Sequence, residues 1–125
     1  MLKKLHTDKA PAAIGPYSQG IRAGNFLFIS GQSPVNPETN EVVERDIVVQ
    51  TNQVMENIKS ILESEGLSLN NIVKTTIFLQ DMEQFSTVNE IYAKHLGDHR
   101  PARSTVEVSR LPKDVLIEIE VIAAI

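Results

Sequence analysis

One long amphipathic segment, from Asp46 to Gly66, places the strongest constraint on the fold. Its side chains at helical spacing form a single, mainly apolar stripe, made of Ile47, Thr51, Val54, Met55, Ile58, Ile61 and Leu62. A stripe with this period predicts a helix that buries one face against a sheet or another helix. Asp46 is positioned to cap the start of the helix, and Gly66 to end it.

Alternation and turn residues predict the other elements. Strands are expected over residues 2–6, 19–22, 26–30 and 73–79, and a second amphipathic helix over residues 85–96, ended by Gly97. Ala23-Gly24-Asn25 has the composition of a tight hairpin turn. Residues 32–44 carry turn-forming residues and no apolar period, so they form the longest expected loop.

The last quarter of the chain alternates like two strands joined by a turn at residues 111–114. In the final strand, one face is apolar throughout and consists of Ile117, Ile119 and Val121. The opposite face is apolar at its ends and acidic in the middle, and it consists of Leu116, Glu118, Glu120 and Ile122. The acidic positions require a compensating partner.

Direct pairing of these two strands would place Thr105 opposite Glu118 and Arg103 opposite Glu120. One arginine would then lie beside two carboxylates. This arrangement is either an anion site next to a base or a structural ion pair, and the spacing favours neither. A shift of two residues in register would also exchange the two glutamates.

The order β-β-β-α-β-α-β-β predicts a two-layer α+β domain with both helices on one face of the sheet. The other sheet face, which carries Glu118 and Glu120, would then be uncovered. A mixed apolar and charged face of this kind is typical of an interaction surface. We therefore expect it to pack against another subunit.

Composition restricts the class of protein. With 125 residues, of which 42% are apolar, residues 1–125 are expected to form a single domain. The chain has no cysteine, which excludes a thiolate nucleophile and a cysteine metal site. The net charge of −4, with scattered basic residues, disfavours nucleic acid as a partner. There is neither a signal-like apolar run after Met1 nor a membrane-length one, so a cytoplasmic location away from membranes is expected.

Several residues have both a functional and a structural interpretation. Gly15-Pro16-Tyr17 and Ser30-Gly31-Gln32 either present site groups or simply form turns, and Asn89 either meets a partner or faces solvent. His95 and His99 are four residues apart, but Gly97 interrupts their helix and no third ligand is at a recognisable distance. No metal site is therefore expected. Nucleotide-binding, zincin and serine-hydrolase motifs do not occur.

Longer blocks resemble a known family. They are Ala10-Pro-Ala-Ala-Ile-Gly-Pro-Tyr-Ser-Gln-Gly20, Ser30-Gly-Gln-Ser-Pro34, Val73-Lys-Thr-Thr-Ile-Phe78, Val88-Asn89 with Tyr92, Pro101-Ala-Arg-Ser104, Arg110-Leu-Pro-Lys-Asp114 and Ile117-Glu-Ile-Glu120. Together they strongly resemble the RidA family, also called the YjgF family, nearly end to end. The resemblance implies a chorismate mutase-like fold, a six-stranded mixed sheet with two helices, and a homotrimer with clefts between subunits.

The resemblance also implies an enzyme, a 2-iminobutanoate/2-iminopropanoate deaminase. It would hydrolyse 2-aminoacrylate and related 2-imino acids, released by pyridoxal-phosphate dehydratases, to 2-oxo acids and ammonia, without cofactor or metal. Arg103 would bind the substrate carboxylate and Glu118 the attacking water. Tyr17 would close the pocket, and the remaining contacts would come from Ser30, Gly31, Asn89 and Thr105.

Two alternatives accompany this interpretation. Some relatives have regulatory or chaperone-like roles, which would make the same clefts a binding site for a small carboxylate without turnover. Others are assigned an endoribonuclease activity, which the acidic balance of this chain disfavours. Two departures from the family pattern affect the site: Thr105 stands where many relatives have cysteine, and His95-Leu96 replaces a common aromatic pair.

Overall fold

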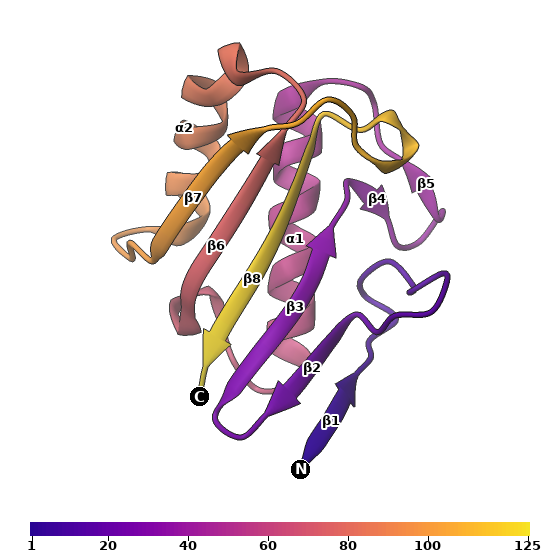
Figure 1. The fold of residues 1–125 in the computed structure, drawn as a ribbon, viewed down its shortest axis with the longest axis vertical. Helices are drawn as coiled ribbons and strands as arrows, with labels where there is room; N and C mark the ends of the chain where they lie inside the picture. The colour runs from indigo at the N-terminus through magenta and orange to yellow at the C-terminus, as the bar shows by residue number, and fades with distance from the viewer.

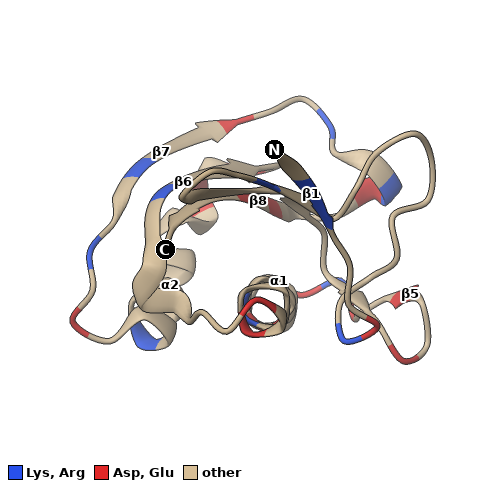
Figure 2. Cartoon of the chain, turned by 90° about the horizontal axis from the view of Figure 1, so that it is seen from below, with Lys and Arg blue, Asp and Glu red and all other residues tan.

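The computed structural model describes all residues from Met1 to Ile125. The main elements are β1 (Leu2–Leu5), β2 (Gly20–Ala23), β3 (Phe26–Gln32), α1 (Ile47–Ser64), β6 (Ile72–Leu79), α2 (Phe85–Leu96), β7 (Ala102–Glu107) and β8 (Ile117–Ala124). Six of them form one mixed sheet in the order β1-β2-β3-β8-β6-β7 (Figure 1). Both helices lie against the same face of this sheet, as Figure 2 shows from the end of the strands. The predicted two-layer α+β fold is confirmed.

Helix α1 begins and ends where its sequence predicts. The side chain of Asp46 accepts a hydrogen bond from the backbone N–H of Val49 at 3.0 Å, which caps the first turn. Gly66 follows the last turn with φ of 73°, a conformation that glycine adopts without strain. All seven residues of the predicted stripe are buried. Neither helix combines the length and the apolar composition needed to cross a bilayer.

The expected loop over residues 32–44 is only partly a loop. It contains a small separate hairpin, in which β4 (Val35–Asn36) pairs with β5 (Glu41–Val42). Asn40 closes this hairpin with φ of 61°. Strands of two residues are too short to show a period, which is why the sequence did not reveal them.

The predicted hairpin between the last two strands is wrong. β7 pairs with β6 in parallel, with Arg103 next to Thr75, and β8 pairs with the other edge of β6, with Glu118 next to Phe78. The cause is α2, which connects β6 to β7 as a crossover and so allows parallel pairing. The segment after β7 then passes the end of β6 before β8 begins. One whole strand therefore separates Arg103 from both glutamates.

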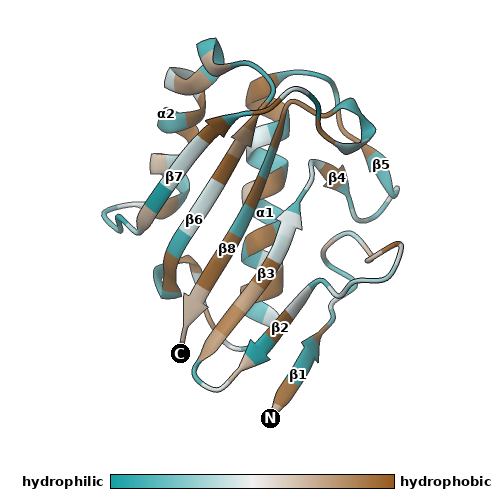
Figure 3. Ribbon diagram, in the orientation of Figure 1, coloured by the Kyte–Doolittle hydropathy of each residue, from teal (hydrophilic) through white to brown (hydrophobic).

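The two faces of β8 are used as its alternation predicts. Ile117, Ile119 and Val121 are buried against the helices, whereas Glu118 and Glu120 lie on the opposite face, which we call the open face. Leu116 was expected on the open face but precedes the strand and is buried in the core. In Figure 3 the open face is towards the viewer, and apolar bands of β3 lie beside the alternating apolar and polar bands of β8.

Candidate functional site

A cavity of about 620 Å³ lies on the open face, and we call it the carboxylate cavity. Its wall includes Tyr17, Ser30, Gly31, Ser33, Glu118 and Glu120. Four of the residues implied by the family resemblance, Tyr17, Ser30, Gly31 and Glu118, therefore come together here from three separate parts of the chain.

Glu118 is the half-buried acid of this cavity, whereas Glu120 is exposed. Ser33 Oγ donates a hydrogen bond to Glu118 Oε2 at 3.3 Å. Burial raises the pKa of Glu118 above its usual range; the Ser33 hydrogen bond opposes this rise, and the charge of Glu120 adds to it. A carboxylate with a raised pKa is suited to accept a proton near neutral pH.

Gly31 leaves the space that the Glu118 side chain occupies. A Cβ atom at Gly31 would lie 2.9 Å from Cδ and 3.1 Å from Cγ of Glu118, closer than van der Waals contact allows. The position of the carboxylate therefore depends on the absence of a side chain at this point of β3.

Ser33 was not identified from the sequence as a site residue. The segment that carries it is fixed by Asn57, a buried residue of α1. Asn57 Nδ2 donates to the carbonyl of Ser33 at 3.1 Å and to that of Val35 at 3.0 Å. The helix thus holds the turn after β3 in a position from which the serine hydroxyl reaches Glu118.

The loop that carries Tyr17 is held by Gln19, which is buried. Gln19 Oε1 accepts from the backbone N–H of Thr7 at 2.8 Å, and Nε2 donates to the carbonyl of Pro11 at 2.9 Å. Ser30 Oγ donates to the carbonyl of Ser18 at 2.6 Å, which ties the same loop to β3. Tyr17 itself is exposed at the edge of the cavity.

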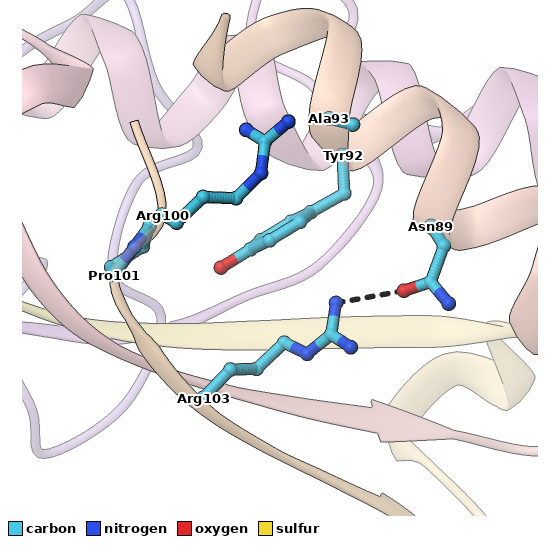
Figure 4. Close-up of a pocket in the computed structure, with 6 residues that line it drawn as sticks. All are labelled: Asn89, Tyr92, Ala93, Arg100, Pro101 and Arg103. Atoms are coloured by element: carbon cyan, nitrogen blue, oxygen red, sulfur yellow. Dashed lines mark hydrogen bonds between the residues drawn. The ribbon is translucent and has the colours of Figure 1, made fainter. Parts of the chain in front are cut away.

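A second cavity, of about 420 Å³, lies between α2 and the N-terminal part of β7, and we call it the arginine cavity (Figure 4). It is lined by Asn89, Tyr92, Ala93, Arg100, Pro101 and Arg103. Arg103 Nη1 donates to Asn89 Oδ1 at 2.7 Å. Asn89 therefore has a partner and lines a cavity, which is not the cavity that Tyr17 borders.

Aromatic rings support the guanidinium of Arg103. Its Cζ atom lies 5.2 Å from the ring centre of Tyr92 and 5.3 Å from that of Phe85, within the range of cation–π attraction. The Tyr92 hydroxyl makes a 2.7 Å hydrogen bond with Thr75 Oγ1. Burial raises the pKa of Tyr92, so the hydroxyl stays neutral at physiological pH.

The predicted site residues thus form two groups that one chain does not unite. Arg103 and Asn89 lie on the helix side of β7, and the other group lies on the open face. The predicted contact between Arg103 and the two glutamates within one chain is wrong, because β6 separates their strands. Thr105 lines neither cavity, and its hydroxyl is buried without a hydrogen-bond partner.

The two histidines contact different groups. His95 Nε2 lies 2.8 Å from Asn52 Oδ1 on the outer surface of the helices, and His99 Nε2 lies 2.7 Å from the carbonyl of Ile72. Burial lowers the pKa of His95. Neither ring lines the arginine cavity or the carboxylate cavity.

Fold and site together define a two-layer α+β protein with polar cavities of small-molecule size on both sides of its sheet. A family profile described as endoribonuclease L-PSP matches residues 7–125. The chain belongs to this family, which is the RidA, YjgF or RutC family, as the sequence blocks predicted.

Individual relatives agree with this assignment. The 2-iminobutanoate/2-iminopropanoate deaminase of Escherichia coli is 52% identical over 98% of both chains. A Rid family protein from Yersinia pestis, described as of unknown function, has a structure with a TM-score of 0.98, 50% identity and full coverage of both chains. The structure of Escherichia coli TdcF with bound serine has a TM-score of 0.94 and 45% identity, with 98% of both chains covered.

Proposed function

We propose that this protein hydrolyses 2-imino acids and their 2-enamino tautomers to 2-oxo acids and ammonia. The substrates are of the type of 2-aminoacrylate, 2-iminopropanoate and 2-iminobutanoate. The observation that carries the proposal is the 52% identity, over 98% of both chains, to the Escherichia coli deaminase that acts on the last two. The paired cavities supply an arginine for the carboxylate and a carboxylate for the water.

The active unit in this proposal is a homotrimer with its sites in the clefts between subunits. One observation supports an assembly of chains: Arg103 and Glu118 lie on opposite sides of the sheet, so a single chain cannot present both to one small molecule. A second is the open face, where Phe26 and Phe28 of β3 remain about half exposed alongside β8, the strand that carries the glutamates. If the open face of one subunit contacted the edge strand β7 of the next, both surfaces would be covered. The cleft between them would then contain Glu118 from one subunit and Arg103 from the other.

Arg103 binds the substrate carboxylate in this cleft. A guanidinium presents two parallel N–H donors to a carboxylate, and this geometry fixes the orientation of the imine carbon. Asn89 and the rings of Phe85 and Tyr92 hold the guanidinium before the substrate arrives. Less conformational freedom is then lost when the substrate binds.

Glu118 holds the water that attacks the C=N carbon. The carboxylate accepts a proton from the water as the C–O bond forms, and one proton passes to the nitrogen, which gives a carbinolamine. The proton of the new hydroxyl then passes to the nitrogen as the C–N bond breaks, so that ammonia leaves while the C=O bond forms. The imine carbon is already electrophilic, so orientation of one water and one substrate provides most of the required catalysis. The raised pKa of Glu118 suits this role as a base.

The remaining residues position the substrate. Tyr17 closes the cleft over the substrate from its exposed loop, and Ser30 and Gly31 provide polar contacts on β3. Ser30 already donates its hydroxyl hydrogen to the carbonyl of Ser18, so its oxygen is oriented as an acceptor. Thr105, in place of the cysteine common in relatives, has its hydroxyl buried in the single chain and reaches the substrate only if assembly of the cleft uncovers it. The protein acts in the cytoplasm on imines released by pyridoxal-phosphate dehydratases.

The decisive test is coupled to a threonine dehydratase. Release of 2-oxobutanoate is followed with and without this protein, in a weakly buffered solution where spontaneous imine hydrolysis is slow. We expect acceleration by the wild type, and none by Arg103→Ala that stays folded and trimeric. Acceleration that survives in Arg103→Ala would contradict the assigned role of the arginine.

A second candidate is a binding protein that uses the same cleft for a small carboxylate without turnover. The relative TdcF, with serine bound in its structure, favours this alternative. It predicts ligand binding that Arg103→Ala weakens, and no acceleration even by the wild type. The family description also names an endoribonuclease, which would cleave RNA. Incubation of the purified protein with RNA tests this activity, and Arg103→Ala serves as the control for contamination. The net charge of −4 disfavours it.

A further inference from the structure

We propose that Arg100 is a second anion-binding residue of this site and extends its substrates to 2-imino dicarboxylates. The proposal rests on the deaminase function proposed above, and it concerns the side chain of the substrate rather than the reaction. 2-Iminosuccinate and 2-iminoglutarate are the simplest members of the class, with one carboxylate beside the imine and another at the end of the side chain.

The charge of the arginine cavity is the first observation. Two guanidiniums, those of Arg100 and Arg103, line a cavity of about 420 Å³, and none of its six lining residues is acidic. Neither arginine forms an ion pair in the chain. A concave surface with two unneutralised positive charges attracts a dianion more strongly than a monoanion. Arg103 alone is sufficient for one carboxylate.

The second observation is that the Arg100 side chain is anchored by hydrogen bonds and still has unused N–H donors. Its Nη1 atom donates to the carbonyl of Gly97 at 2.6 Å and to that of His99 at 2.8 Å, just beyond the end of α2. Its Nε and Nη2 atoms have no partner within the chain. An anchored guanidinium with unused N–H groups loses little conformational freedom when it binds a carboxylate.

The third observation is the arrangement of the two guanidiniums around Tyr92. Figure 4 shows Arg100 and Arg103 approaching the ring of Tyr92 from opposite sides, with the guanidiniums well apart. Burial raises the pKa of the Tyr92 hydroxyl, and the charges of both arginines oppose that rise, so both lie close to this ring. Two cations on either side of one ring suit a ligand with two separated carboxylates.

The reaction itself is unchanged for such a substrate. Water adds to the C=N carbon, the nitrogen leaves as ammonia, and the product is a 2-oxo dicarboxylate. No bond of the distal carboxylate forms or breaks. Arg100 is therefore a specificity residue, and its effect is confined to how strongly substrates with a second carboxylate are bound.

A purely structural role for Arg100 makes a different prediction. Its hydrogen bonds to Gly97 and His99 satisfy carbonyl groups of the turn that follows α2. If this were its only role, loss of the side chain would lower the melting temperature and affect all substrates alike. The ratio between substrate classes therefore separates the two roles.

The test compares kcat/KM for the two dicarboxylate imines with that for 2-iminopropanoate. Amino-acid oxidases generate the imines from aspartate, glutamate and alanine, and semicarbazide competes with hydrolysis for each imine. In Arg100→Ala we expect the dicarboxylate to monocarboxylate ratio to fall about ten- to hundredfold, the loss typical of one charge-assisted contact. Arg100→Lys should restore part of the ratio. Arg100→Gln, which keeps a donor for the carbonyls but no charge, should behave like Arg100→Ala.

Lys94→Ala is the matched control, because it removes one positive charge from the last turn of α2 outside the cavity. The ratio should stay at the wild-type value in this variant. A wild type that hydrolyses 2-iminopropanoate but neither dicarboxylate would overturn the proposal, and so would an unchanged ratio in a folded Arg100→Ala.

Calorimetric binding of 2-oxoglutarate and 2-oxobutanoate provides a readout that does not require turnover. We expect the wild type to bind the dicarboxylate more tightly and Arg100→Ala to lose this preference. If no imine is hydrolysed at all, the deaminase function fails, and the same titration still decides the role of Arg100. Equal affinity for both oxo acids in the wild type would refute that role.

Discussion

The side chain of Glu118 lies directly over Gly31, so that the two residues share a space in which only one can have a side chain. Glu118 Cδ is 2.9 Å from the point that a Cβ atom at Gly31 would occupy. Two neighbouring strands, β3 and β8, contribute the pair. The relationship explains how a carboxylate on an open sheet face has one defined position.

Gly31→Ala should therefore displace the carboxylate without unfolding the protein. The backbone at Gly31 does not have a positive φ, so alanine is not strained there. A shift of about 1 Å in a catalytic group lowers activity about a hundredfold. We expect kcat/KM to fall by this order and the circular dichroism spectrum to stay unchanged. Gly24→Ala, in the turn between β2 and β3, is the control, with some loss of stability and wild-type kinetics.

Ser33→Ala should move the acid limb of the pH–rate profile to higher pH. In the proposed mechanism turnover requires ionised Glu118, and the limb of kcat/KM then reports the pKa of this group in the free enzyme. Burial raises that pKa and the hydrogen bond from Ser33 opposes the rise, so loss of the hydroxyl raises the pKa further. Activity then falls at mildly acidic pH and approaches the wild-type value at alkaline pH.

Ser33→Thr is the matched control, because it keeps a hydroxyl on the same carbon atom. Its acid limb should stay near that of the wild type. If the limb of Ser33→Ala also stays in place, either the hydrogen bond to Glu118 is absent in solution or another group controls the rate.

Tyr92→Phe should destabilise the fold by about 1–3 kcal/mol, the usual cost of a buried polar group left without a partner. The change leaves Thr75 Oγ1 buried without its 2.7 Å hydrogen bond. Thr75→Val removes that hydroxyl as well. The double variant should therefore lose less stability than the sum of the two single variants. Denaturant unfolding at one fixed protein concentration measures all four proteins; full additivity would contradict the pairing.

Phe28→Asp should prevent formation of the proposed trimer. Phe28 is 46% exposed on the open face beside Ile122, and a charge there would be buried without a partner in the assembly. Val48→Asp is the control, because Val48 is 44% exposed on the outer side of α1. Sedimentation should give a monomer without deaminase activity for the first variant and an active trimer for the second. A trimeric Phe28→Asp would place the interface elsewhere.

The sequence predicted most of the local structure because local signals determine it. Asp46 and Gly66 mark the ends of α1, and Gly24 marks the β2–β3 turn, each through the backbone conformation that the residue favours. The predicted pairing of β7 with β8 was wrong, because alternation determines which face of the sheet a side chain occupies and not which strand lies alongside. That choice depends on α2, whose crossover brings β7 to the free edge of β6.

Those residues of the candidate site that stand in family motifs were predictable from the sequence, and the others were not. Arg103, Asn89 and Glu118 stand in recognisable blocks, and the structure places each at a cavity. Ser33 stands in one of these blocks without an assigned role and Arg100 lies just outside them; only the fold brings these residues to Glu118 and to Tyr92. No spacing in the chain predicts either contact, because both depend on segments that meet through the sheet and α2.

The insertion of β6 between β7 and β8 has a consequence for mixed assemblies. If each cleft takes its arginine from one chain and its glutamate from the next, an arginine substitution in one chain and a glutamate substitution in another do not disable every cleft. A ring that contains both Arg103→Ala and Glu118→Gln chains has one cleft in which both functional side chains are intact. Two inactive preparations, dissociated and reassembled together, would then regain activity that neither has alone, as expected for an enzyme whose catalytic unit is the junction between chains.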